Sequence, residues 1–170
     1  MSNNPMYDHS IPVFARVLGN LSAILDKGAK HCEARKIDPS AILGARLFPD
    51  MFPLTRQVQV AADQAKGGAA RLAGIEVPKY EDTEKTFDEL KARLAKTVAF
   101  VNGVKAEQLA ESAGRVITLQ AGPRTLTFKG EWYLKHFVLP NLYFHVTTAY
   151  DILRHNGVEL AKQDFIGSVN

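Results

Sequence analysis

Hydrophobic residues along most of this chain recur at steps of three and four, the period that places them on one face of an α-helix. The first such segment runs from about Ser10 to Arg35, and we expect Ser10 to cap it. Asp38-Pro39 ends this helix and predicts a short helical turn through Leu43. The apolar stripe of the first helix comprises Phe14, Val17, Leu18, Leu21, Ile24 and Leu25.

Two further helices follow with clear boundary signals. The second is predicted to begin at Pro53, a residue that suits the first helical position, and to end at Gly74. Its inward face is rich in alanine, so a neighbouring helix can approach closely, although Gly67-Gly68 weakens it by ~1 kcal/mol per glycine relative to alanine. The third begins with a capping box, Thr86 to Glu89, and ends at Gly103.

The period then changes to two, which is typical of β-strands. Residues 115–120 and 124–129 are rich in Thr, Val, Ile, Leu and Phe and flank Ala121-Gly122-Pro123. This pattern predicts a β-hairpin over about 115–129. An isolated two-stranded hairpin is marginal in water, so we expect it to pack on the helices.

A fourth helix is predicted from about Gly130 to Asn156. Pro140 lacks an amide hydrogen and leaves the carbonyl of His136 without its helical partner, so a kink or break is expected there. Residues 158–170 are expected to form an extended tail that wraps the bundle. The whole chain, residues 1–170, is thus predicted to be one mainly α domain with a four-helix bundle.

Composition agrees with a folded domain in a reducing compartment. The chain has 170 residues, of which 46% are hydrophobic, enough for a substantial core. Its single cysteine, Cys32, excludes an internal disulfide. Neither a signal-peptide pattern at the N-terminus nor a run of ~18 apolar residues is visible, so we expect a cytoplasmic protein without membrane association.

The net charge of +3 raises the question of nucleic-acid binding. Lysine and arginine are scattered singly along the chain, mostly with acidic residues nearby. Binding to phosphates requires a clustered basic surface. The sequence therefore predicts no nucleic-acid partner.

Familiar catalytic motifs are absent, but polar residues interrupt two otherwise apolar helices. Asn141 and His145 are four residues apart and share a helix face, so both could reach one ligand; Gln59 and Asp63 have the same spacing. Gln57 joins them in the predicted pocket. The complete set of interrupting residues is Gln57, Gln59, Asp63, His136, Asn141, His145, Thr148 and Tyr150.

Structural roles compete with the pocket. His145 is as readily a buried histidine satisfied by its neighbours as a ligand-binding group. One of Gln57 and Gln59 is expected to face solvent. Asn141 could instead hydrogen-bond the backbone that Pro140 frees.

Several stretches resemble one uncharacterised bacterial family within the DinB/YfiT-like superfamily, whose members are proposed metalloenzymes. The most specific stretch is Leu139–Tyr150 with Ile152–Val158, and residues 51–66 and 162–167 agree with it. The resemblance covers essentially the whole chain. It implies a four-helix bundle with a long crossover.

The resemblance also implies a metal site of one histidine on the second helix and a His-x-x-x-His pair on the fourth. Here His145 matches the second histidine of the pair, whereas Asn141 replaces the first and Gln59, or alternatively Gln57, replaces the histidine of the second helix. Neutral amides are poor zinc ligands. We therefore expect a retained pocket that binds zinc or nickel weakly at best.

Two functions follow as hypotheses. The first is a small-ligand-binding or enzymatic bundle, in which His145 is the one candidate general base. The second is a non-enzymatic structural or stress-associated protein. A homodimer through helix faces is expected as well as a small-molecule ligand.

Overall fold

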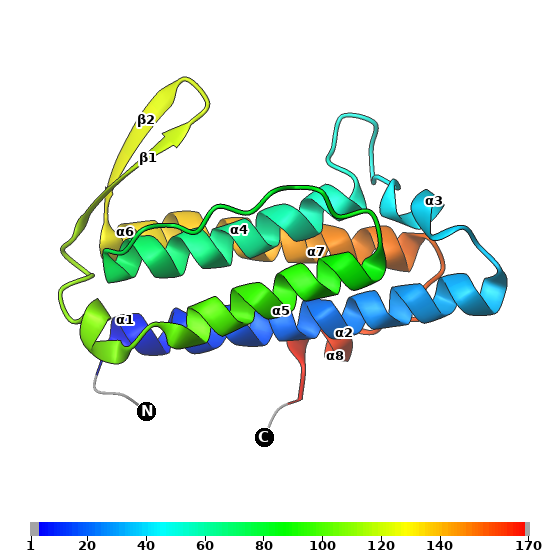
Figure 1. Ribbon diagram of the computed structural model, residues 1–170, viewed down its shortest axis with the longest axis horizontal. Coiled ribbons are helices and arrows are strands. Elements are labelled where there is room, and N and C mark those ends of the chain that lie inside the picture. The colour runs from blue at the N-terminus through cyan, green and yellow to red at the C-terminus, as the bar shows by residue number, and fades with distance from the viewer. Residues whose placement is uncertain (1–3, 169–170) are drawn as a thin grey trace.

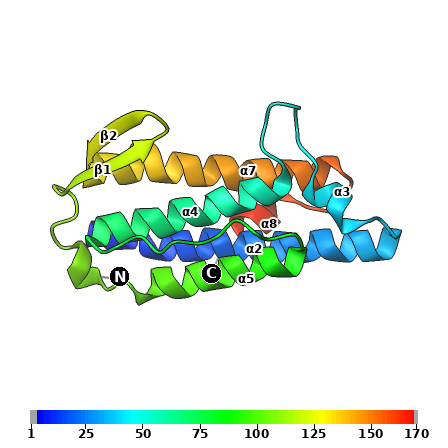
Figure 2. The same cartoon turned by 45° about the horizontal axis from the view of Figure 1, so that its top comes forward.

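Four long helices lie side by side in this computed structural model, which describes residues 4–168 (Figures 1 and 2). A β-hairpin projects from one end of the bundle. No helix in this range is long and apolar enough to span a membrane. In chain order the elements are α1 (Pro5–Asp8), α2 (Ile11–Arg35), α3 (Pro39–Leu43), α4 (Leu54–Ala73), α5 (Phe87–Gly103), η1 (Ala106–Leu109), β1 (Val116–Ala121), β2 (Arg124–Lys129), α6 (Gly130–Tyr133), η2 (Leu134–Val138), α7 (Leu139–His155) and α8 (Lys162–Ile166).

The bundle consists of α2, α4, α5 and α7, and its order requires a long crossover. α4 and α5 run in the same direction, so the linker 74–86 returns along the length of the bundle (Figure 1). α4 packs mainly on α7, and α2 mainly on α5. The predicted four-helix bundle with a crossover is confirmed.

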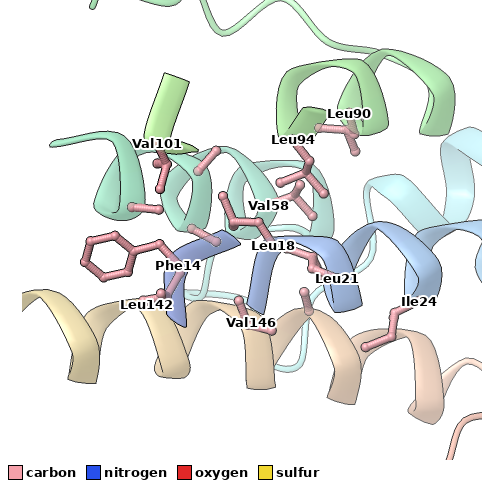
Figure 3. Close-up of a cluster of buried hydrophobic side chains, with 14 of the residues drawn as sticks. Phe14, Leu18, Leu21, Ile24, Val58, Leu90, Leu94, Val101, Leu142 and Val146 are labelled. Atoms are coloured by element: carbon pink, nitrogen blue, oxygen red, sulfur yellow. The ribbon is translucent and has the colours of Figure 1, made fainter. Parts of the chain in front are cut away.

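Apolar side chains from all four helices fill the space between them (Figure 3). Gly68 of α4 allows a close approach at this point, because a Cβ atom there would lie 2.7 Å from Val138 and 3.2 Å from Phe14. Gly68 therefore has a packing reason despite its low helix propensity. Side chains exposed by no more than 1% include Phe14, Leu18, Leu21, Val58, Leu90, Leu94, Leu142 and Val146.

The helix starts differ from prediction at Ser10. A short helix, α1, precedes α2, and the side chain of Asn4 caps it by accepting from the amides of Met6 and Tyr7. Ser10 occupies the cap position of α2, but its hydroxyl donates to the carbonyl of Met6 at 2.5 Å. The predicted cap is wrong because the end of α1 presents this carbonyl to the same hydroxyl.

The later boundaries follow the sequence signals closely. Thr86 and Glu89 form the predicted capping box of α5. Gly74 ends α4 in the left-handed conformation, with φ at 70°, whereas Pro53 caps α4 and is not its first residue. The hairpin pairs Val116 with Lys129 and is antiparallel throughout.

The hairpin packs on the helices through one aromatic side chain, as predicted. Phe128 of β2 stacks on Trp132 at 5.2 Å and on Tyr133 at 5.8 Å between ring centroids. Its ring also lies 5.3 Å from that of Phe137.

The fourth helix does not break at Pro140. Residues 134–138 form a π-helical turn that ends two residues before Pro140, and α6, η2 and α7 continue one another. A π turn adds one residue to the ring that each hydrogen bond closes, which accommodates a missing amide. The helix is therefore widened locally at the π turn, and the expected kink or break at Pro140 does not occur.

The tail was predicted to be extended, and this is wrong for α8. This short helix packs on α2: Asn20 donates to the carbonyl of Phe165 at 3.0 Å, and Lys27 pairs with Asp164 at 2.8 Å. Polar contacts with α2 thus stabilise a turn that the hydrophobic pattern does not reveal. Residues 169–170 lie outside the described range.

Candidate functional site

His145 of α7 and Gln57 of α4 form a hydrogen-bonded pair where these two helices pack together. Nδ1 of His145 lies 2.7 Å from Oε1 of Gln57. Nε2 of Gln57 donates to the carbonyl of Phe52 at 3.1 Å, which leaves Oε1 as the acceptor of this amide. Nδ1 therefore carries the proton, and the imidazole has its lone pair on Nε2.

The surroundings of His145 favour the neutral ring. The residue is 8% exposed, and this burial lowers the pKa of the imidazole. The positive charge of Arg56 lowers this pKa further. Within the described part of the chain, Nε2 takes part in no hydrogen bond, so its lone pair is available to a ligand. A neutral imidazole of this kind can accept a hydrogen bond or a proton.

The aromatic ring of Phe144 borders the pair. The ring of Phe144 lies edge-on to that of His145, with 5.2 Å between centroids, and Phe144 is 55% exposed. Phe52, whose carbonyl accepts from Gln57, is also exposed, and the guanidinium of Arg56 lies 5.8 Å from its ring. A bound molecule at Nε2 would therefore meet apolar surface beside one polar acceptor.

Gln59 and Asp63 belong to a different cluster on the other side of α4. Nε2 of Gln59 donates to Glu84 at 2.9 Å, and Asp63 accepts from Lys66 at 2.8 Å. The expectation that one glutamine faces solvent is wrong, since Gln57 is 1% and Gln59 4% exposed. Both are covered because α7 packs on one side of α4 and the crossover linker on the other.

Arg93 of α5 organises this second cluster. Its side chain is 2% exposed and contacts three carboxylates, those of Asp63 at 3.0 Å, Asp82 at 2.9 Å and Glu84 at 3.0 Å. It also donates to the carbonyl of Glu81 at 3.0 Å. Since Asp82, Glu84 and Glu81 lie in the linker 74–86, Arg93 fastens the crossover to the bundle. Within residues 4–168, Nε of Arg93 is the one buried side-chain nitrogen or oxygen without a partner.

Charge around the crossover is closely balanced. Burial raises the pKa of the Glu84 carboxyl, but hydrogen bonds from the backbone, Arg93 and Gln59 outweigh it and hold this pKa below its usual value. The ring of Tyr80 faces the ammonium groups of Lys66 at 3.9 Å and Lys96 at 4.2 Å. These contacts tie the linker to α4 and α5, which is a structural role.

Asn141 turns back onto its own helix. Its Nδ2 donates to the carbonyl of Phe137 at 2.7 Å, at the end of the π turn. The structural alternative for Asn141 is therefore the one that the geometry shows. His136 is exposed and lies against Trp132, with 5.0 Å between ring centroids, and Thr148 donates to the carbonyl of Phe144 at 2.8 Å.

The residues at the implied metal positions do not fit a divalent ion. Asn141 is bonded to backbone, Gln57 holds the imidazole, and Gln59 faces the crossover. Nε2 of His145 is the one ring nitrogen left at these positions, amide oxygens are poor zinc ligands, and a structural or catalytic zinc site needs three or four ligands. Between residues 4 and 168, no group of three or more His, Cys, Asp or Glu side chains is arranged so that it could hold a metal ion.

Arg56 and Arg93, the two arginines beside these clusters, were not among the residues predicted from the sequence. A signal for Arg93 existed, because it lies three residues after Leu90 on the buried stripe of α5, where a charge needs buried partners. Arg56 gave no such signal. Its importance depends on which side chains the crossover brings to it.

The fold defines the class of protein: a mainly helical, DinB-like bundle with a small hairpin before its last long helix. It is similar to a crystal structure described as a DinB family member protein from Shewanella denitrificans, with a TM-score of 0.90 and 41% identity over 96% of this chain and 92% of that one. Residues 6–166 match the family model "Domain of unknown function (DUF1993)". The chain belongs to this family. A search of curated proteins gives no match.

Proposed function

We propose that the protein binds a small organic molecule at the Gln57–His145 pair, through Nε2 of His145 and without a resident divalent metal. The observation that carries this proposal is the bond from Nδ1 to Gln57, which fixes the tautomer and leaves the Nε2 lone pair unused. Orienting an imidazole by a hydrogen bond to its other nitrogen is how proteins prepare it as a ligand or base.

The chemistry around the pair suggests the class of ligand. A lone pair on Nε2 requires a donor such as a hydroxyl, thiol or amine, and the exposed ring of Phe144 favours an apolar or aromatic body beside that donor. If the protein is an enzyme, His145 is the general base, since its lowered pKa keeps it unprotonated at neutral pH.

The test uses matched pairs of compounds. Phenols, aromatic thiols and benzylic alcohols supply the donor, and their methyl ethers or thioethers keep the shape but lack it. Binding would be followed through the ring nitrogen resonances of His145 in labelled protein. We expect the donors to shift Nε2 and the ethers to leave it unchanged, with no response in His145→Gln and a normal one in His136→Gln.

Metal loading tests the other half of the proposal. We expect no stoichiometric binding of zinc, nickel or manganese by mass spectrometry of the intact protein. One tightly held ion per chain that disappears in His145→Ala would contradict a metal-independent site.

A non-enzymatic structural role is the second candidate, and the filled centre of the bundle favours it. Of the five predicted pocket residues, Gln57 and His145 bond to each other, Gln59 and Asp63 belong to the cluster at the crossover, and Asn141 bonds to its own helix. In that case His145→Gln would lower stability, and no donor compound would bind at Nε2.

A further inference from the structure

A cleft of about 430 Å³ lies between the C-terminal half of α2 and the turn that follows α7. After α7 the chain crosses to α2 and then forms α8 against it (Figure 1). The residues that line this cleft are separate from the Gln57–His145 pair and from the cluster around Arg93. Small-molecule sites typically have volumes of about 300–1,000 Å³, so the cleft is large enough for a small organic molecule.

One face of α2 supplies four basic side chains to the cleft. Lys27, Lys30, His31 and Arg35 follow one another at helical spacing, although like charges at these spacings weaken an isolated helix. The dipole of a helix favours cations near its end, but this effect falls off within the last turn. It accounts for Arg35, the one basic residue in the last turn of α2, and not for Lys27 or Lys30. The basic face therefore needs another explanation.

Most of these basic side chains have no acidic partner in the protein. Lys27 pairs with Asp164 of α8 at 2.8 Å. Among the described residues, the side chains of Lys30, His31 and Arg35 take part in no ion pair or hydrogen bond. The opposite wall of the cleft carries one carboxylate, that of Glu159. An anion in the cleft would therefore meet donors that are not already used.

The turn after α7 brings its backbone against His31. Gly157 has φ at 90°, a conformation that favours glycine. A Cβ atom there would lie 3.6 Å from Cε1 and 3.8 Å from Nε2 of the imidazole. His31 is half-buried at this position, and its ring donates at least one hydrogen bond in either protonation state. It thus places a hydrogen-bonding group in the wall of the cleft, beside the more exposed Lys30 and Arg35.

The chemistry of the lining indicates a phosphate ester. Lysine, arginine and protonated histidine donate charge-assisted hydrogen bonds to phosphate oxygens, and arginine can do so with two parallel N–H groups. Glu159 would repel further anionic groups, but its carboxylate accepts hydrogen bonds from hydroxyl groups. The lining therefore suits a molecule with one phosphate and a hydroxyl-bearing body. A nucleic acid, which carries a charge at every nucleotide, suits it less well.

We propose that this cleft binds a phosphate monoester of a small polyhydroxy compound, such as a sugar phosphate. Lys30, His31 and Arg35 hold the phosphate, and Glu159 accepts from the hydroxyl groups. The site is independent of the ligand proposed for the Gln57–His145 pair, and either can exist without the other.

Titration of the full chain with glucose 6-phosphate, in a phosphate-free buffer of low ionic strength, tests the proposal. The ring resonances of His31 in labelled protein, assigned by their loss in His31→Gln, report binding. We expect a saturable shift with a dissociation constant of about 1 mM or tighter. Glucose and inorganic phosphate, which each lack one half of the ligand, should bind at least about tenfold more weakly.

Variants of the lining test the role of each group. Lys30→Gln and Arg35→Gln should each weaken the binding of glucose 6-phosphate at least about tenfold, because each removes a charge-assisted hydrogen bond. Glu159→Ala should bring the affinities for glucose 6-phosphate and inorganic phosphate closer together, since it removes both the repulsion and the hydroxyl acceptor. Lys105→Gln is the matched control: this exposed lysine precedes η1, which packs on α1 at the other end of α2, and its loss should leave the affinity unchanged.

Three results would overturn the proposal. The first is a set of His31 resonances that do not move at up to about 10 mM glucose 6-phosphate. The second is equal affinity for glucose 6-phosphate and inorganic phosphate, which would mean an adventitious ion only. The third is a response that neither Lys30→Gln nor Arg35→Gln weakens, because the ligand would then use another surface.

Discussion

Oε1 of Gln57 accepts from Nδ1 of His145 across 2.7 Å, between residues 88 positions apart in the chain. This bond joins α4 to α7 and decides which nitrogen of the imidazole faces outward. Because Gln57 is itself held by the carbonyl of Phe52, neither side chain can turn without losing a buried hydrogen bond. The pair therefore combines a structural contact with an available acceptor atom.

Replacing Gln57 should release this arrangement. Gln57→Leu leaves Nδ1 and the Phe52 carbonyl unpaired, and we expect a loss of about 1–3 kcal/mol in the free energy of unfolding. Long-range proton–nitrogen spectra of the histidine ring should then show a mixture of tautomers. Gln57→Glu is the matched variant: it keeps the acceptor, adds a negative charge and should raise the pKa of His145. An unchanged tautomer in Gln57→Leu would contradict the assignment.

The lowered pKa of His145 predicts how stability depends on pH. Its folded pKa lies below the unfolded value of about 6.5, so the unfolded chain takes up this proton first as the pH falls. The contribution of the neutral ring is complete above about pH 6.5 and declines as the pH falls towards the folded pKa. Urea unfolding at pH 7.5 and 5.5 should show that the free energy of unfolding falls more between these two pH values in the native chain than in His145→Gln. Equal slopes would show that burial does not depress this pKa.

Removing Arg93 should loosen the crossover. Arg93→Met leaves the carboxylates of Asp63, Asp82 and Glu84 together without their buried cation, and we expect a cost of about 3–5 kcal/mol. Hydrogen exchange should rise first in residues 79–86. Lys91→Met is the control: it removes partly exposed ion pairs and should cost under about 1 kcal/mol. If the amides of residues 79–86 stayed protected from exchange in Arg93→Met, Arg93 would not be the residue that holds the crossover on the bundle.

Two glycines in helices should respond in opposite directions to alanine. At Gly68 a Cβ meets Val138 and Phe14, so Gly68→Ala should destabilise by about 1–3 kcal/mol through overpacking. At Gly19 a Cβ meets nothing within 4 Å, so Gly19→Ala should stabilise by about 0.5–1 kcal/mol through helix propensity. Thermal or urea unfolding of both variants measures the difference. Stabilisation by Gly68→Ala would mean that α4 has room for a methyl group beside Val138 of η2 and Phe14 of α2.

Local patterns predicted the elements well because their causes are local. The apolar stripe of α2, the capping box at Thr86 and the Gly-Pro turn of the hairpin each depend on residues within a few positions. The predicted cap at Ser10 is wrong because its hydroxyl can either accept from the first amides of α2 or donate to a carbonyl of α1. In the presence of α1 it donates to the carbonyl of Met6.

The sequence by itself determined the helices, the hairpin, the alanine-rich face of α4 and the polar residues that could carry function. Tertiary structure decided which of those residues meet. Residues two apart on a helix, such as Gln57 and Gln59, point to nearly opposite sides. Gln57 bonds to His145 and Gln59 to Glu84 only because α7 packs on one side of α4 and the crossover packs on the other. Spacing along the chain determines the direction in which a side chain points from its helix. Its partners across the bundle depend on how all the helices pack together.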